Sequence, residues 1–293
     1  MGTYHLMSYT PMRDRVPIRP CPARGLRAST RAVQTHGSTM GLLLVLLAGW
    51  LWAAAVGATP QHVRLPEGNT RGFLVVRTLD GQAIAHGELV QKPTRGLIES
   101  RMQLHFTDGS QYEETVAFSQ KQVFRLERYR LVQRGPSFPT TDVAFDRKSG
   151  QYTARHQAKK GSDEKAASGP LELPADLYNG MMTTLLKNLP RGAGTTVQMV
   201  AFTPEPRLLT MELAPQGEET VRLGKVTTTV ARYRVKLELG GLTGLIAPVL
   251  GKQPPDLSYW LVRGDVPAFV RFEGPMFLHG PVWRLELTPV PLP

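Results

Sequence analysis

The sequence predicts an all-β protein with one short helix, an antiparallel meander curled into a barrel or half-barrel. Alternation is clearest over Thr227–Leu239, in whose second half apolar residues alternate with arginine, lysine or glutamate. Short runs of this kind recur from Phe73 onward, and Xaa-Gly pairs separate many of them. A period of two with one charged face is typical of an antiparallel sheet whose other face lies on a core.

The predicted strands follow one another as hairpins. Xaa-Gly pairs mark the turns, because glycine tolerates the positive φ of a tight turn. Four pairs lie between strand-like runs: Asp80-Gly81, Asp108-Gly109, Ser149-Gly150 and Gln216-Gly217. Two further runs repeat the alternation, with apolar Met102, Leu104 and Phe106 in one and Trp283, Leu285 and Leu287 in the other. Roughly a dozen sequential strands favour a sheet that curls on itself.

One helix is expected to interrupt the sheet. Apolar residues recur at helical spacing between Leu177 and Leu189, after Pro174 and before Pro190. Proline is favoured where a helix begins and ends it where its missing N–H is needed. We expect this amphipathic helix to pack on the apolar face of the sheet or to plug one end of the barrel.

An export signal precedes the predicted domain. Residues 41–58 form an uncharged apolar run that ends in small residues, and Val56 and Ala58 suit the −3 and −1 positions of a signal-peptidase site. We therefore expect a disordered or mis-called extension over 1–39, a signal peptide over 40–58 cut after Ala58, and a periplasmic or secreted product. Retention of the run as an N-terminal anchor is the alternative.

The expected mature chain, 59–293, is interpreted as a single β-barrel-like domain with a mobile loop at 157–170. Removal of the leader lowers the formal net charge from +11 to +6 and takes away Cys21, the only cysteine. The product then has no disulfide and no thiolate chemistry. Its basic excess is interpreted first as a mildly basic solvated surface. As a binding signal, it fits anionic envelope polymers or lipid headgroups better than nucleic acid, which we do not expect as a partner.

Motifs for catalysis are weak, and an enzyme is not supported. His86 and Glu88 share a strand face and His105 belongs to a neighbouring run, which is too little to predict a metal site. The pairs Glu113-Glu114 and Glu218-Glu219 are interpreted as solvated turn flanks, because adjacent side chains on a strand point to opposite faces. We predict no catalytic residue, no metal and no cofactor.

An apolar stretch, 240–251, lies between two predicted strands where a polar loop is usual. It either covers an open end of the sheet or offers an apolar patch to a partner or membrane. Large aromatics concentrate in the segment that follows, where they either line a cavity or fill a solid core. The candidate ligand-binding residues are Leu245, Ile246, Trp260, Phe269 and Trp283.

Residues 244–287 resemble the C-terminal part of a family of exported bacterial proteins catalogued only as a domain of unknown function. The resemblance rests on GLIAPVLGKQPP at 244–255, Trp260, Gly264, PAFVR at 267–271, EGP at 273–275 and GPVWRLEL at 280–287, with a second block, LPADLYNGMMTTLLKNLP, at 173–190. It implies an all-β periplasmic protein and supplies no catalytic residues. The architecture is also similar, in outline, to lipoprotein-carrier half-barrels, which hold acyl chains in an apolar concavity.

These observations favour an exported binding module of unassigned specificity that holds a hydrophobic or lipid-like envelope molecule. The alternative is a structural or interaction protein of the cell envelope without a small ligand, in which the 240–251 stretch contacts a protein partner. A hydrolase acting through His86, Glu88 and His105 ranks third. An outer-membrane barrel ranks last, because the outward faces carry charges rather than an apolar band. The sequence leaves the ligand, the partner and the oligomeric state open.

Overall fold

The computed structural model describes residues 60–158, 161–202, 205–223, 225–238 and 255–288, all within one of the two compact units of the chain. These residues form one antiparallel sheet of fourteen strands and one helix, which confirms the predicted fold class. The strands are β1 (Thr70–Arg77), β2 (Ala83–Thr94), β3 (Leu97–Phe106), β4 (Gln111–Gln120), β5 (Phe124–Arg134), β6 (Thr140–Asp146), β7 (Gln151–Gln157), β8 (Lys165–Pro170), β9 (Thr195–Phe202), β10 (Pro206–Leu223), β11 (Val226–Glu238), β12 (Leu257–Val262), β13 (Ala268–Pro275) and β14 (Val282–Thr288), and the helix is α2 (Met182–Asn188).

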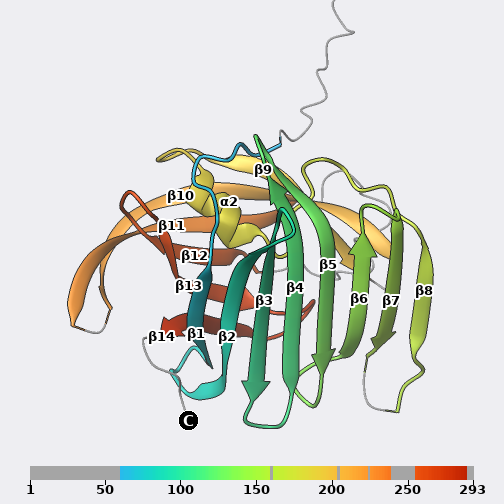
Figure 1. The fold of residues 1–293 in the computed structure, drawn as a ribbon. Coiled ribbons are helices and arrows are strands. Elements are labelled where there is room, and N and C mark those ends of the chain that lie inside the picture. Colours follow the sequence, from blue (N-terminus) through green and yellow to red (C-terminus); the bar gives the residue numbers. More distant parts are fainter. Residues whose placement is uncertain (1–59, 159–160, 203–204, 224, 239–254, 289–293) are drawn as a thin grey trace, which may run out of the picture. The chain divides into compact units, whose positions relative to one another are not determined.

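The strand order is β8-β7-β6-β5-β4-β3-β2-β1-β14-β13-β12-β11-β10-β9, so the first and last strands pair in the middle of the sheet. The two edge strands, β8 and β9, are neighbours in sequence and are joined by the segment that contains α2. Figure 1 shows α2 inside the curl of the sheet. The main apolar core accordingly joins helix residues to side chains of β3–β7 on one side and β9–β12 on the other.

Burial along the strands follows the predicted alternation. In β11, Ala231, Tyr233 and Val235 are buried while Arg232 is exposed. The outer face carries cross-strand ion pairs, such as Arg271 with Glu286 at 2.9 Å between β13 and β14. Opposite charges directly across a ladder stabilise the pairing of strands. The sheet therefore presents apolar side chains inward and ion-paired side chains outward over most of its strands.

Two boundaries differ from the sequence-based expectation. The helix begins only at Met182, because Gly180 has a φ of +68° and the residues before it follow β9 instead of a helical path. There Tyr178 N donates to Gln198 O at 2.9 Å and Gln198 N donates to Asp176 O at 3.0 Å, which covers the free edge of β9. The expected loop at 157–170 is shorter than predicted, since Lys165–Pro170 pairs with β7 as strand β8.

The segment before β1 is fastened to the end of α2. The side-chain oxygen of buried Asn188 accepts hydrogen bonds from the backbone N–H of Arg64 at 2.8 Å and of Leu65 at 2.7 Å. Gln61 N donates to the hydroxyl of Tyr178 at 2.8 Å. Within the described ranges, no helix has the length and apolarity that crossing a membrane requires.

Candidate functional site: an apolar cavity inside the curled sheet

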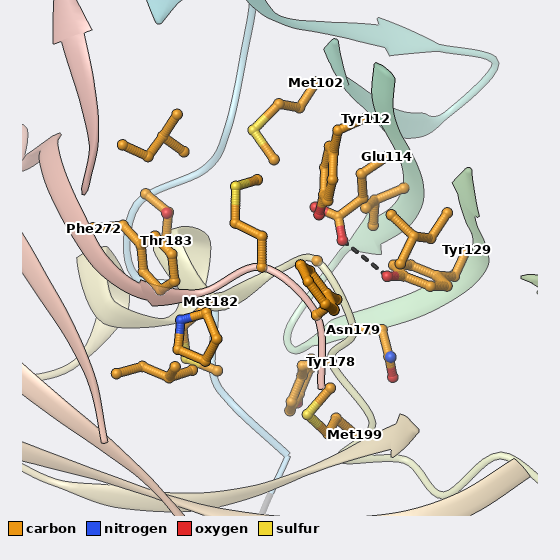
Figure 2. A pocket seen from close by; sticks show the side chains of 18 of the residues that line it. Met102, Tyr112, Glu114, Tyr129, Tyr178, Asn179, Met182, Thr183, Met199 and Phe272 are labelled. Carbon is orange, nitrogen blue, oxygen red and sulfur yellow. Dashed lines mark hydrogen bonds between the residues drawn. The ribbon is translucent and has the colours of Figure 1, made fainter. Parts of the chain in front are cut away.

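A cavity of about 840 Å³ lies inside the curl. Its walls come from inward positions of β1–β7 on one side and of β9–β14 on the other, with α2 and the turn before it between them. Figure 2 shows methionine side chains on several sides of the cavity, among them Met102, Met182 and Met199, with the ring of Phe272 beside them. Unbranched methionine side chains adapt to ligands of irregular shape.

The short helix explains why the interior is not filled. Seven helical residues extend about 10 Å at 1.5 Å per residue. A ten-residue strand such as β4 extends about 33 Å. The apolar face of α2 therefore covers only part of the inward surface of the sheet. Leu185 and Leu186 are fully buried in the core, whereas Met182 and Thr183 border the cavity.

An aromatic cluster packs against the cavity, and one of its rings, Phe277, also lines it. Phe138, from the β5–β6 connection, lies 4.9 Å from Phe106, 5.6 Å from Phe277 and 5.7 Å from Trp283, measured between ring centroids. All three contacts are edge-to-face, a favoured geometry for aromatic pairs. The rings form a packed core, and Trp283 belongs to this core.

A polar group interrupts the apolar wall. Glu114 points inward from β4, and the Tyr129 hydroxyl of β5 donates a hydrogen bond to its Oε1 at 2.9 Å, as Figure 2 shows. Tyr112 lies two residues before Glu114 on the same face of β4 and also lines the cavity. We call Tyr112, Glu114 and Tyr129 the glutamate–tyrosine cluster.

Burial sets the protonation of this cluster. Loss of solvent raises the pKa of Glu114, and the phenols of Tyr129 and Tyr112 oppose that rise without reversing it. Burial also raises the pKa of Tyr112 and of Tyr129 well above the ordinary tyrosine value, and the nearby Glu114 adds to both shifts. The two phenols therefore remain hydrogen-bond donors at any physiological pH, and the carboxyl group favours its neutral form more than an exposed glutamate does.

The turn before α2 closes over the cluster. The side-chain amide of Asn179 donates to Val200 O at 2.8 Å and accepts from Val200 N at 2.8 Å, so it pairs with β9 as a strand residue would. Gly180 follows, and a Cβ there would lie 2.5 Å from Val116 Cγ2 and 3.2 Å from Glu114 Cδ. Glycine thus allows the turn to approach β4 closely enough to form part of the cavity wall.

Basic residues also border the cavity. Lys187 Nζ lies 2.5 Å from Glu67 Oε1, an ion-pair distance without hydrogen-bond geometry. Arg71 borders the cavity as well, but its side chain pairs with Glu88 on the outer face at 2.8 Å. Within the described part of the chain, Nε of Arg207 is buried without a hydrogen-bond partner. The lining is therefore apolar with separate polar points.

The five predicted ligand-binding residues do not come together. Phe269 lines the cavity, but Trp283 lies in the aromatic core. Trp260 lies on the opposite face of the sheet, because its strand neighbours Tyr259 and Leu261 point inward. There its indole N–H donates to Glu219, and the guanidinium of Arg232 lies 5.1 Å from the ring centre. Leu245 and Ile246, like the whole 240–251 stretch, lie outside the described residues.

His86 and His105 are partners across β2 and β3, with ring centroids 6.3 Å apart. Both lie on the outer face, and Glu88 forms its ion pair with Arg71. Among the residues that the structure describes, no group of three or more His, Cys, Asp or Glu side chains is arranged to hold a metal ion.

The sequence analysis was wrong about Glu114, which is not a solvated turn flank. The two members of the Glu113-Glu114 pair diverge as predicted, with Glu113 paired to Arg101 outside at 3.1 Å and Glu114 facing the cavity. The alternation of residues along β4 could have predicted that Glu114 points inward. Tyr112, Val116 and Phe118 are all buried and share the parity of Glu114.

The raised pKa of Glu114 predicts a pH effect on stability. The folded chain binds the Glu114 proton more tightly than the unfolded chain, so the free energy of unfolding falls as the pH rises above the ordinary glutamate pKa of about 4.3, until it passes the folded pKa. Each unit of pKa displacement corresponds to about 1.4 kcal/mol. Glu114→Gln lacks this titration, so the wild-type free energy of unfolding should decline relative to the variant over that window in urea titrations at a series of pH values.

Other shifted groups, such as His156 and Asp176, are present in both proteins and cancel in the comparison. A difference between wild type and Glu114→Gln that stays constant from acidic to neutral pH would contradict the assigned protonation.

Comparisons with known proteins found a similar solved structure. No protein-family model and no curated protein matches the sequence. The structure is similar to the crystal structure of a β-barrel-like protein of the domain of unknown function DUF1849 from Brucella abortus, with a TM-score of 0.37 and 10% sequence identity over 75% of this chain and 96% of that one. That protein, like the family that the sequence resembles, is described only as a domain of unknown function.

Proposed function

We propose that the chain is an exported binding module that holds a hydrophobic or lipid-like molecule in the cavity of the curled sheet. The observation that carries this proposal is the cavity itself, whose volume of about 840 Å³ and largely apolar walls suit a ligand of that kind. Ligand sites in proteins typically occupy about 300–1,000 Å³ and combine apolar walls with a few polar groups. The apolar run at 41–58 supports export to the periplasm or beyond the cell.

The apolar walls provide enough free energy for binding. Each methylene group moved from water into an apolar site contributes about 0.8 kcal/mol. A chain of ten methylenes would therefore gain about 8 kcal/mol, part of which is lost to the restriction of ligand motion. A long acyl chain buried along the cavity is thus expected to bind without any ionic contact.

A substitution that fills the cavity tests the proposal. Met102 lines the cavity from β3, and Met102→Trp adds an apolar ring to the space that a ligand would occupy. We expect it to weaken binding of the neutral fluorescent probe N-phenyl-naphthylamine by about tenfold or more. A loss of about 1.4 kcal/mol of binding free energy raises the dissociation constant tenfold. Probe fluorescence titrations measure the dissociation constants.

The matched control is Gln103→Trp, one residue further along β3. Gln103 faces outward, where its side chain contacts Glu113, so the same ring is added on the other face of the sheet. Equal probe binding by the two variants, or no probe binding by the wild type, would contradict the proposal. Native mass spectrometry of the protein purified from its own membranes then identifies any hydrophobic molecule that it carries. Absence of probe binding would favour the structural or interaction role.

A further inference from the structure

The glutamate–tyrosine cluster is a polar site in the largely apolar wall of the cavity. Glu114 lies at an inward position of β4, where its neighbours of the same parity are Tyr112 and the buried Val116. Burial of a carboxyl group is costly unless hydrogen bonds replace those to water. Tyr129 provides one such bond, at 2.9 Å, whereas a carboxyl group has two oxygens and about four acceptor sites. Glu114 therefore has hydrogen-bonding capacity left on the cavity side.

Among the described residues, the groups that act on the pKa of Glu114 carry no positive charge. They are the phenols of Tyr129 and Tyr112, and burial is the larger influence. Within the described ranges, Glu114 forms no ion pair. Tyr259, which faces it from β12, is a third phenol with a raised pKa. Asn179, whose side-chain amide pairs with Val200 of β9, opposes the rise in the pKa of Tyr129. The described polar side chains that act on the carboxyl group are therefore neutral hydrogen-bonding groups.

We propose that Glu114, Tyr112 and Tyr129 bind an uncharged hydrogen-bonding group of the ligand, a hydroxyl or the carbonyl of an ester or amide, while the apolar part of that ligand fills the cavity. This inference rests on the proposed binding function and adds the class of ligand to it. It makes the glutamate–tyrosine cluster, as distinct from the basic residues elsewhere in the lining, selective for neutral polar head groups over carboxylates and ammonium groups.

The selectivity follows from the balance of charge and hydrogen bonds. Glu114 accepts through its remaining lone pairs and, in its neutral form, also donates. The phenolic oxygen of Tyr129, whose only proton is donated to Glu114, can accept, so the cluster can pair with a hydroxyl or a carbonyl. A ligand carboxylate would lose its hydration and find no cation at the cluster. An ammonium group would lose its hydration as well, and it would gain a counter-ion only from an ionised Glu114, the form that burial disfavours.

Four lipids with one chain length and different head groups test the inference. Palmityl alcohol, palmitamide, palmitate and palmitylamine are each titrated at neutral pH against N-phenyl-naphthylamine bound to the full chain. We expect the alcohol and the amide to bind at least about tenfold more tightly than palmitate and palmitylamine, the effect of one net hydrogen bond. Tighter binding of palmitate or palmitylamine would overturn the inference.

Variants then assign the preference to the cluster. Tyr129→Phe and Glu114→Leu should each reduce the ratio of alcohol to palmitate affinity by about tenfold, because each removes a hydrogen-bonding group. Glu114→Gln should restore the preference, because the amide is neutral and both donates and accepts. Glu113→Gln, on the outer face, is the control that should leave the ratio unchanged. A purely structural role of the cluster would change stability and leave the ratio intact in all four variants, which would overturn the inference.

The two proposals fail in different ways. If the probe and all four lipids fail to bind, the proposed binding function is wrong. If all four bind equally, the cavity holds a hydrophobic molecule but the glutamate–tyrosine cluster does not select its head group. Loss of palmitylamine binding in Glu114→Gln, with tight binding in the wild type, would show that Glu114 acts as a charged counter-ion, which would also overturn the inference.

Discussion

Replacement of Gly87 by alanine is expected to lower the free energy of unfolding by about 3 kcal/mol or more, near the upper limit for overpacked positions. Gly87 lies in the middle of β2, opposite Leu74 on β1 and Leu104 on β3. A Cβ at this position would lie 1.8 Å from the backbone oxygen of Gln103 and 2.9 Å from Cα of Leu104. Both contacts are to backbone atoms, so no change of rotamer relieves them, and β2 and β3 would have to separate.

Chemical denaturation of the wild type and the variant measures this loss. Gly68→Ala is the matched control, because a Cβ at Gly68 meets no atom within 4 Å and the same change of residue should alter stability by less than about 1 kcal/mol. A variant at Gly87 that unfolds at the same denaturant concentration as Gly68→Ala would show that β2 and β3 are not as close as the structure places them.

The sequence was sufficient to predict the sheet because the two faces of its strands differ so strongly in chemistry. Alternation in β3, β11 and β14 assigned the inward residues correctly, and Leu104, Val235 and Leu285 are all buried. The start of the helix was not predictable from spacing alone. Leu177 and Met181 fit the helical period, but the positive φ of Gly180 and the pairing of Asn179 with β9 take the chain along another path. Tertiary contacts with β9 overrode the local pattern.

The cavity could be anticipated only as an alternative to a solid core. Its volume depends on how much of the curled sheet a seven-residue helix covers, and no residue type signals that difference. The number of aromatics in the C-terminal segment was a poor guide, because Trp260 packs on the outer face and Trp283 packs in the aromatic core. The odd or even position of a residue along its strand was the better guide to the face on which its side chain lies. It places Trp260 outside, next to inward Tyr259, and it places Glu114 inside, next to outward Glu113.

Asn188→Ala is expected to have the second largest effect, a loss of about 2–4 kcal/mol, because it leaves two backbone donors without a partner. The Asn188 side chain accepts from the N–H groups of Arg64 and Leu65 and donates to Thr184 O at 2.9 Å, and the residue is 2% exposed. Because Asn188 is buried, alanine leaves a gap that faces the two N–H groups, and water replaces the lost hydrogen bonds only in part. Thermal and chemical unfolding measure the change, with Asn69→Ala, at an exposed asparagine, as the control.

Hydrogen exchange measurements show which part of the chain loses stability in Asn188→Ala. If Asn188 fastens the segment before β1 to α2, the amides of Arg64 and Leu65 should exchange faster in Asn188→Ala than the loss of global stability accounts for. Uniform acceleration across the sheet would instead assign the residue a role in the core alone. The distinction bears on the cavity, because Lys187, next in the chain, both lines it and lies beside Glu67 of that segment. Release of the segment should therefore also weaken probe binding, in proportion to the loss of protection at Arg64 and Leu65.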